Sequence, residues 1–516
     1  MTRQTFIQGA LILILAGMIT RFLGFINRLV IARLMGEEGV GLYMMVLPTL
    51  FLMITLTQIG LPIAISKRIA EANAKNDKSE IKKIMIVSSF FILGTSIILT
   101  TLLIIASPII TNKFLTDSRT IFPLIAMVPI VPLIAFSSII KGYFQGMHNM
   151  KPQSYALILE QIVRVVLVFI FLRLLLPLGI EYAAAGAMIS LVIGELCSFL
   201  YLFYMFRKYN SLKGQGELLT NLLNSKKTMY RLFSIALPTT GSRLINSISS
   251  FIEPILVTQS LVIAGVATNL ITKQYGELMG YVMPLLFLPT FITNSLSIVI
   301  VPSISETEAK GYRKKTHLRI QQAIRISLVS GALATIVLSL FPGPILTYMY
   351  GTDQASPFLS LMAPFFILLY IQTPLQASLQ ALDLAQAAMW NSLIGNIVKL
   401  SVVFLLASNP QFGMMGVAIG IVCGVILITL LHYATLKRAI NFKLDIIDLM
   451  KFIILILITT VVGKNLYSYY IKTNTLLSFI SSILLLFILY LCLLYVLKII
   501  SRKELEQIPI LKHLLK

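Results

Sequence analysis

Long apolar segments recur along the whole sequence, and they limit what this chain can fold into. Each is about 20 residues long, the length at which an α-helix crosses a hydrocarbon core of roughly 30 Å. Of the 516 residues, 57% are hydrophobic and 12% are charged, a composition typical of membrane proteins. The sequence therefore predicts an all-α polytopic membrane protein.

Fourteen segments meet this length and polarity. Because backbone polar groups cannot stay unpaired in hydrocarbon, each is expected to be a helix. The segments cover residues 6–33, 42–66, 84–106, 121–140, 155–176, 183–206, 232–258, 278–303, 322–341, 358–379, 389–407, 414–436, 450–470 and 475–497.

Positive charges gather in alternate connecting segments. With a cytoplasmic N-terminus, the segments on that side carry 29 of the 42 Lys and Arg residues. The segments on the other side carry seven: Arg33, Lys113, Arg119, Arg173, Lys273, Lys464 and Lys472. Cytoplasmic loops are enriched in these residues, so we expect a multi-pass protein of the cell membrane with both termini in the cytoplasm. The net charge of +22 then reflects membrane topology rather than nucleic acid binding.

Two halves of the chain carry similar sequences. EQIVRVVLVFIFL, which begins at Glu160, resembles GNIVKLSVVFLLA, which begins at Gly395, and this pairs Arg164 with Lys399. Further on, AAAGAMISLVIGEL resembles GMMGVAIGIVCGVI at nearly the same separation. Because each half holds six spans, both halves would enter the membrane in the same sense. Such parallel repeats form the two halves of many transporters.

The repeat predicts a two-lobed bundle around a central cavity, with two additional C-terminal helices. A weaker match between the halves pairs Arg21 with Arg243. The predicted parts are a first six-helix lobe (1–206), a cytoplasmic linker (207–231), a second six-helix lobe (232–436), an extra helix pair (437–497) and a cytoplasmic tail (498–516).

Arg21, Arg28 and Arg243 stand inside apolar segments, and no acid lies close in sequence to neutralise Arg21 and Arg28. An Arg at the bilayer centre costs at least about 2.5–3.5 kcal/mol, so such residues are expected to face a protein interior or a wet cavity. Arg21 and Arg28 are seven residues apart and share one stripe of a helix. With Arg243 they would suit a phosphate or pyrophosphate, which guanidinium groups bind through paired hydrogen bonds. Pairing with Glu253 or Glu195 is the structural alternative.

Other intramembrane polar residues have more than one explanation. Glu160 and Arg164 are four residues apart and could neutralise each other, or they could line the cavity or the contact between lobes together with Lys399. Glu253 comes directly before Pro254, and a carboxylate beside a broken helix could bind Na⁺ or a proton. We therefore consider Glu253 a candidate for ion coupling.

Several kinds of site are missing from the sequence. There is no GxxxxGK[ST] motif for ATP, and the scattered Cys and His residues give no metal-ligand spacing. The loops hold isolated acids such as Glu37, Glu38, Asp117 and Asp353, with nothing at catalytic spacing. The sequence therefore predicts that the protein is not an enzyme and has no metal centre, ATPase domain or bound cofactor. Transport could instead be coupled to Na⁺, to H⁺ or to the membrane potential.

Three stretches of the sequence resemble a known family. RFLGFINRLVIARLMGEEGVGLYMMVLP, GLPIAISKRIAEANAKND and SSIIKGYFQGMHNMKPQSYALILEQIVR are similar to the polysaccharide-transporter branch of the multidrug/oligosaccharidyl-lipid/polysaccharide exporter superfamily, and within it to the stage V sporulation protein B group. The resemblance extends over essentially the whole chain.

The resemblance implies a flippase that moves undecaprenyl-pyrophosphate-linked sugars, such as the peptidoglycan precursor lipid II, to the outer leaflet by alternating access. In this group the product would serve spore cortex synthesis, with wall-synthesis glycosyltransferases as candidate partners. The related peptidoglycan flippases hold the pyrophosphate with cavity arginines and the lipid tail in a groove near the last two helices. The family pattern of Arg, two residues, Gly, two residues, Arg begins with Arg21 and Gly24, but Asn27 stands in place of the second Arg and Arg28 follows.

Two other functions remain open from the sequence. One is a cation-coupled exporter of small amphiphilic drugs, for which we would expect acids rather than arginines in the cavity. The other is a membrane scaffold for wall-synthesis enzymes that transports nothing. The scaffold hypothesis predicts that replacing Arg21 is harmless in a protein that folds and localises.

Overall fold

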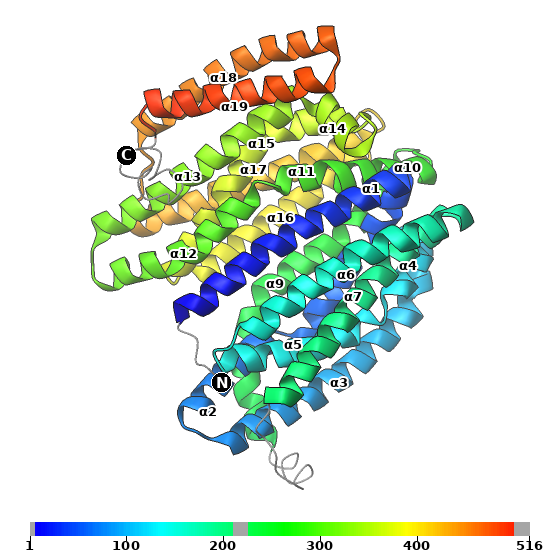
Figure 1. The fold of residues 1–516 in the computed structure, drawn as a ribbon, viewed down its shortest axis with the longest axis vertical. Coiled ribbons are helices and arrows are strands. Elements are labelled where there is room, and N and C mark those ends of the chain that lie inside the picture. Colours follow the sequence, from blue (N-terminus) through cyan, green and yellow to red (C-terminus); the bar gives the residue numbers. More distant parts are fainter. Residues whose placement is uncertain (1–5, 210–224, 500–516) are drawn as a thin grey trace. The chain divides into compact units, whose positions relative to one another are not determined.

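The computed structural model describes residues 6–209 and 225–499, and its described elements are all helical (Figure 1). The prediction of an all-α protein is confirmed. Most of the predicted linker and almost all of the predicted tail lie outside the described residues. The chain divides into two compact units, residues 1–284 with 400–417 and residues 285–399 with 418–516.

The first unit contains the N-terminal helices. They are α1 (Phe6–Gln58), α2 (Leu61–Ala74), α3 (Lys78–Ile109), α4 (Ile121–Met127), α5 (Ile130–Gly146), α6 (Lys151–Leu175), α7 (Ile180–Tyr209), α9 (Ser225–Ile263) and α10 (Thr268–Gly276). Short helical turns of other types join them. The π-helical turns are η1 (Ile110–Phe114) and η4 (Glu277–Val282), and the 3₁₀ turns are η2 (Ser118–Thr120) and η3 (Leu176–Leu178).

The second unit contains the later helices. They are α12 (Thr290–Ala309), α13 (Arg313–Leu340), α14 (Pro342–Tyr350), α15 (Ser356–Ala381), α18 (Ile446–Thr473) and α19 (Leu476–Val496). Three helices pass from one unit to the other along the chain: α11 (Met283–Phe287), α16 (Ala385–Ala407) and α17 (Gly413–Ile440).

Helix boundaries follow local sequence signals. At the start of α3, the side chain of Asp77 accepts a hydrogen bond from the Glu80 backbone N–H at 2.9 Å. Thr475 and Ser478 form a capping box at the start of α19. Within α1, Gly36 has φ 67°, a conformation that favours glycine, and it divides the helix into two arms.

Among the described residues, 11 helical segments are long and apolar enough to cross a membrane, or 12 if the bent pair Thr268–Phe287 and Thr290–Ala309 forms one span. The difference from the fourteen expected segments arises at two places. Leu15–Ala74 counts as one segment of 60 residues although it contains the break at Gly36, and α9 is not in the count.

Each unit has its own apolar core. In the first unit, Ile65, Tyr143 and Phe144 join α2 to α5. In the second, Ile304, Ile324 and Leu379 join α12, α13 and α15. Large apolar side chains are also exposed along α18 and α19, which lie side by side (Figure 1). An apolar outer face suits hydrocarbon as the solvent.

Candidate functional site

Arg21 and Arg28 lie on the first arm of α1 and are exposed. Neither forms an ion pair with any residue that the structure describes. Between them, Asn27 is 3% exposed, and its Oδ1 has no hydrogen-bond partner among the described residues. The first arm of α1 therefore exposes Arg21 and Arg28 on a mostly apolar stretch of helix, with Arg33 as a further exposed cation near the break at Gly36.

Arg243 lies on α9, in the same unit as Arg21 and Arg28, and is also exposed. One turn further along α9, the hydroxyl of Ser247 is 2.8 Å from that of Thr55 on the second arm of α1. Residues four apart share a helix face, so Arg243 lies one turn from the contact between α9 and α1. Like the other two arginines, it has no ion-pair partner in the described part of the chain.

Glu160 and Arg164 belong to a group of charges on three helices, in which Glu195 is buried and the others are half-buried. The Nζ of Lys141 on α5 is 3.5 Å from Oε1 of Glu195 on α7, and Glu195 faces Glu160 on α6. Arg164 donates a hydrogen bond of 3.1 Å to the Tyr43 hydroxyl. The electrostatic partners of Glu160 thus include residues of two neighbouring helices as well as Arg164 of its own.

A glycine explains why these helices approach so closely. A Cβ at Gly194 on α7 would lie 3.0 Å from the Glu160 carbonyl oxygen. The same kind of contact recurs in the second unit, where a Cβ at Gly424 on α17 would lie 2.9 Å from the Lys399 Cβ on α16. Lys399 thus occupies the same place beside Gly424 that Arg164 occupies beside Gly194.

Glu253 lies on α9 beside Pro254 and is half-buried, with Tyr275 of α10 among its electrostatic neighbours. Within the described ranges, no group of three or more His, Cys, Asp or Glu residues could hold a metal ion. The three cysteines are free.

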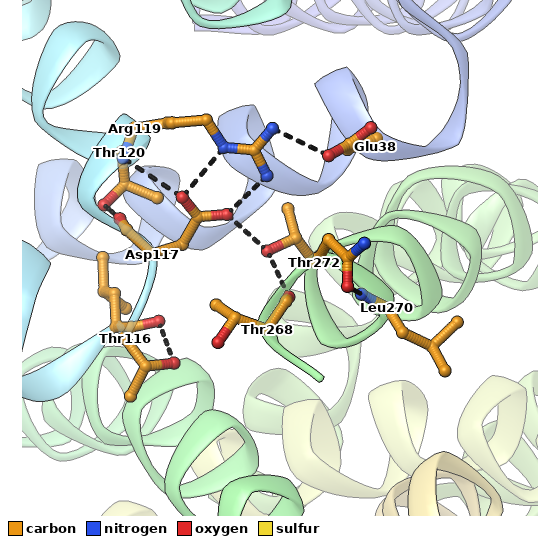
Figure 2. A network of polar contacts seen from close by, with 10 residues as sticks. Glu38, Thr116, Asp117, Arg119, Thr120, Thr268, Leu270 and Thr272 are labelled. Atoms are coloured by element: carbon orange, nitrogen blue, oxygen red, sulfur yellow. Dashed lines mark hydrogen bonds and ion pairs between the residues drawn. The ribbon is translucent and has the colours of Figure 1, made fainter. Parts of the chain in front are cut away.

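The structure also contains a network of polar contacts that the sequence did not predict, which Figure 2 shows. Arg119 donates from Nε to Asp117 Oδ1 at 3.1 Å and from a terminal nitrogen to Oδ2 at 2.9 Å, and its other terminal nitrogen is 2.7 Å from Glu38. Thr272 on α10 donates to Asp117 Oδ2 at 2.8 Å. Glu38, Asp117, Arg119 and Thr272 form what we call the Asp117 network.

The expectation that Glu37, Glu38 and Asp117 are isolated acids is therefore wrong. Glu37 pairs with Lys273 on α10 at 3.0 Å, next to the Asp117 network. The sequence carried one local signal, an acid and a base two residues apart at Asp117 and Arg119. The partners on α1 and α10 are far away in the sequence, and only folding brings them to Asp117.

Asp117 is 4% exposed and lies in the loop between α3 and α4. Burial alone would raise the pKa of its carboxyl, but hydrogen bonds from Arg119 and Thr272 and the positive charge of Arg119 outweigh that effect and lower its pKa. The carboxylate is therefore ionised at neutral pH.

Two glycines let α10 approach α1 beside the Asp117 network. A Cβ at Gly276 would overlap the Glu37 carbonyl oxygen, and a Cβ at Gly41 would overlap the Thr272 carbonyl oxygen. Nearby, Gln259 on α9 donates to the Lys113 carbonyl at 2.6 Å. Segments of the two predicted sequence repeats thus touch through backbone and polar groups at this end of the unit.

The second unit contains an apolar pocket of about 260 Å³ between α13, α15, α17 and α18. Its walls include Leu328, Leu375 and Phe452. Charged groups line the same pocket, with Arg325 on α13 and Asp445 at the start of α18.

Comparisons with known proteins assign the family. Residues 6–308 match the family described as polysaccharide biosynthesis protein. The chain is 47% identical over 516 residues to stage V sporulation protein B of Bacillus subtilis (strain 168), with both chains covered in full. It is 25% identical over 423 residues to lipid II flippase MurJ of the same organism, which covers 76% of each chain.

Solved structures share the fold at low sequence identity. Lipid II flippase MurJ in an inward closed conformation aligns with a TM-score of 0.69 over 93% of this chain and 97% of that one, at 17% identity. An inward-facing multidrug resistance MATE family transporter of the MOP superfamily aligns with a TM-score of 0.65 over 82% and 94%, also at 17% identity. The chain is therefore a multi-pass membrane protein of the polysaccharide biosynthesis protein family and a homologue of stage V sporulation protein B, and it shares its fold with lipid II flippase MurJ and with a transporter of the MOP superfamily.

Proposed function

We propose that this protein flips an undecaprenyl-pyrophosphate-linked glycan, with lipid II as the first substrate to test, from the inner to the outer leaflet for spore cortex synthesis. The observation that carries the proposal is the exposure of Arg21, Arg28 and Arg243 on α1 and α9, with no acid paired to them in the described structure. The pyrophosphate of the lipid would supply the missing negative charge.

The fold and the relatives support this substrate class. Stage V sporulation protein B is similar over the full chain, and lipid II flippase MurJ is similar in both sequence and fold. Under this proposal the apolar pocket beside α18 is the place for the lipid tail, since its walls are mostly hydrocarbon. The charge bias of the loops supports fourteen spans with both termini in the cytoplasm.

Transport by alternating access requires a contact that opens and closes. The Asp117 network and the Gly41 and Gly276 contacts join α1 to α10, which belong to different sequence repeats. The charge pattern predicts that this end of the helices is outside. We assign these contacts to the closed state of the outer side, and the contact of Gly424 with Lys399 supports a repeated, two-lobed architecture.

The direct test is flipping of fluorescent lipid II in proteoliposomes. We expect Arg21→Ala and Arg28→Ala to slow flipping at least about tenfold at matched amounts of folded protein, equivalent to about 1.4 kcal/mol of lost stabilisation. Arg173→Ala is the matched control, because Arg173 also lies on a spanning helix but stacks over the Phe169 ring at 4.2 Å.

The outcomes separate substrate from site. If the wild type flips lipid II and both variants flip it equally well, the pyrophosphate binds at other residues. If the wild type moves no lipid II under an ion gradient or membrane potential, other undecaprenyl-linked glycans are tested next. If the wild type flips none of these glycans, the proposal is refuted. Export of a cationic drug in that case would favour the multidrug exporter hypothesis.

A further inference from the structure

The four charges on α5, α6 and α7 have no role in the pyrophosphate site described above. They are Lys141, Glu160, Arg164 and Glu195, all within segments that are long and apolar enough to cross a membrane. Glu195 is 4% exposed, and its Oε1 is buried without a hydrogen bond. Lys141 approaches that oxygen to 3.5 Å, which is ion-pair distance without hydrogen-bond geometry.

Glu160 lies across the contact between α6 and α7 from Glu195, because a Cβ at Gly194, the residue before Glu195, would lie 3.6 Å from Cγ of Glu160, and the two acids act on each other electrostatically. An ionised carboxylate has only acceptors, so two carboxyl groups can share a hydrogen bond only when one of them carries a proton. Two buried carboxylates this close also repel each other when both are ionised. The geometry itself therefore points to a proton as the missing partner.

The fold does not require these acids. In the second unit, α16 and α17 make the same kind of glycine contact through Gly424 and Lys399. The sequence match that pairs Arg164 with Lys399 places Gly395 where the first copy has Glu160, and Val425 where it has Glu195. The same helix packing thus forms without the two acids, although ionisable groups inside a membrane are costly.

We propose that Glu160 and Glu195 form a proton-binding site that holds one proton between them, and that its uptake and release drive the transport cycle. The coupling step rests on the proposed transport function, whereas the binding site does not. Uptake forms one O–H bond on a carboxylate oxygen with a proton from water, and release returns that proton to water. With both acids ionised, their two negative charges cancel the positive charges of Lys141 and Arg164. Binding of the one proton therefore changes the net charge of the group from zero to +1.

Among the described residues, the charged and titratable groups that face the site come from four helices. Lys141 comes from α5, Glu195 from α7 and Arg164 from α6 itself, while Tyr43 of α1 accepts the hydrogen bond from Arg164. The two cations keep the unprotonated acids neutralised, which lowers the cost of losing the proton inside the membrane.

A packing contact connects the proton site to the arginines of α1. A Cβ at Gly24 would lie 3.8 Å from Oε1 of Gln161, the residue that follows Glu160. Gly24 lies between Arg21 and Arg28 on α1. The proton site therefore lies next to the packing contact between α6 and the helix that carries the proposed pyrophosphate ligands.

The test is infrared difference spectroscopy of the purified protein across a pH titration, which detects the carbonyl stretch of a protonated carboxyl group. We expect the wild type to show such a band inside the membrane region and to lose it in both Glu160→Gln and Glu195→Gln. Glu71→Gln is the control, because Glu71 is an exposed residue near the end of α2 that pairs with Arg68, and its band pattern should match the wild type. Lys141→Gln should keep the band, since removing a cation favours the neutral carboxyl.

The outcomes are decisive without any glycan. No titrating band in the wild type, or a band that survives in both Gln variants, would overturn the proton site. Loss of the band on adding NaCl at constant pH would show a metal cation in its place and would also overturn it.

A lumenal pH dye in proteoliposomes then tests coupling. We expect the wild type to move protons in a way that depends on lipid II, and we expect the rate of that movement to fall at least about tenfold in Glu195→Gln. An unchanged dye signal in that variant refutes the coupling step.

Discussion

At the scale of single residues, Asp117 shows how a buried charge is kept ionised. Its two carboxylate oxygens accept hydrogen bonds from the side chains of Arg119 and Thr272, and Arg119 extends the network to Glu38. Hydrogen bonds to charged groups contribute about 1.5–3 kcal/mol each, which offsets the cost of burial. The carboxylate therefore stabilises a contact between segments that are distant in the sequence.

We predict that Asp117→Asn destabilises the protein by about 1.5–3 kcal/mol, because the amide would keep the shape of the side chain but lose the charge that Arg119 and Thr272 bind. The measurement is the apparent unfolding temperature in detergent at pH 7. Asp77→Asn is the control, since Asn caps a helix about as well as Asp. An unchanged unfolding temperature for Asp117→Asn would mean that the network contributes nothing to stability.

The pH dependence of stability follows from the same residue. The pKa of Asp117 is lowered in the folded protein, so its contribution is fully present above the ordinary value of 3.8 and is lost as the pH falls through the lower folded pKa. We expect the difference in stability between the wild type and Asp117→Asn to stay constant from pH 7 to about pH 5 and to shrink below about pH 4. A difference that shrinks already between pH 7 and pH 5 would contradict this assignment.

At the scale of elements, the contact between α1 and α10 depends on glycine. The nearest atoms to an added Cβ at Gly276 are backbone atoms of Glu37 and Gly41, which cannot rotate away as a side chain could. Close backbone approach through small residues is the usual way in which membrane helices pack. The Gly276 contact therefore decides whether α1 and α10 can meet.

We predict that Gly276→Ala separates α10 from α1 and lowers the apparent unfolding temperature, while also changing the rate of flipping. Gly94→Ala is the matched control, because Gly94 lies inside α3 with no atom within 4 Å of an added Cβ, and Ala favours a helix by about 1 kcal/mol over Gly. Gly94→Ala should thus match or exceed the wild type in stability. Equal unfolding temperatures for the two variants would show that α10 can move away from α1 without loss of stability.

At the scale of the whole molecule, the loop charges make a prediction about orientation. Segments rich in Lys and Arg stay in the cytoplasm, so residues 151 and 443 should be inside and residues 411 and 472 outside. We expect an impermeant maleimide to label Gln411→Cys and Lys472→Cys in intact cells, and Lys151→Cys and Lys443→Cys only after permeabilisation. Cys197, Cys423 and Cys492 are replaced first. Labelling in the reverse pattern would invert the proposed direction of transport.

The sequence by itself determined the fold class and the family. Its apolar segments are long enough to cross a bilayer, and in hydrocarbon only helices satisfy every backbone polar group within one segment, so local composition was sufficient to predict an all-α membrane protein. Sequence also singled out Arg21, Arg28 and Arg243, because a cation in an apolar segment is visible without any knowledge of its neighbours. The part that these three residues play in binding stays a prediction.

Tertiary structure alone decided which polar groups meet. The i,i+4 spacing of Glu160 and Arg164 suggested a local ion pair, but the folded chain brings Glu160 to Glu195 on a neighbouring helix and turns Arg164 toward Tyr43. Asp117 likewise accepts a hydrogen bond from Thr272, which is 155 residues away in the sequence. The physical reason is that side-chain pairing depends on how closely two helices pack, and that distance is set by small residues such as Gly194 and Gly276, whose partners lie on other helices and cannot be read from one segment.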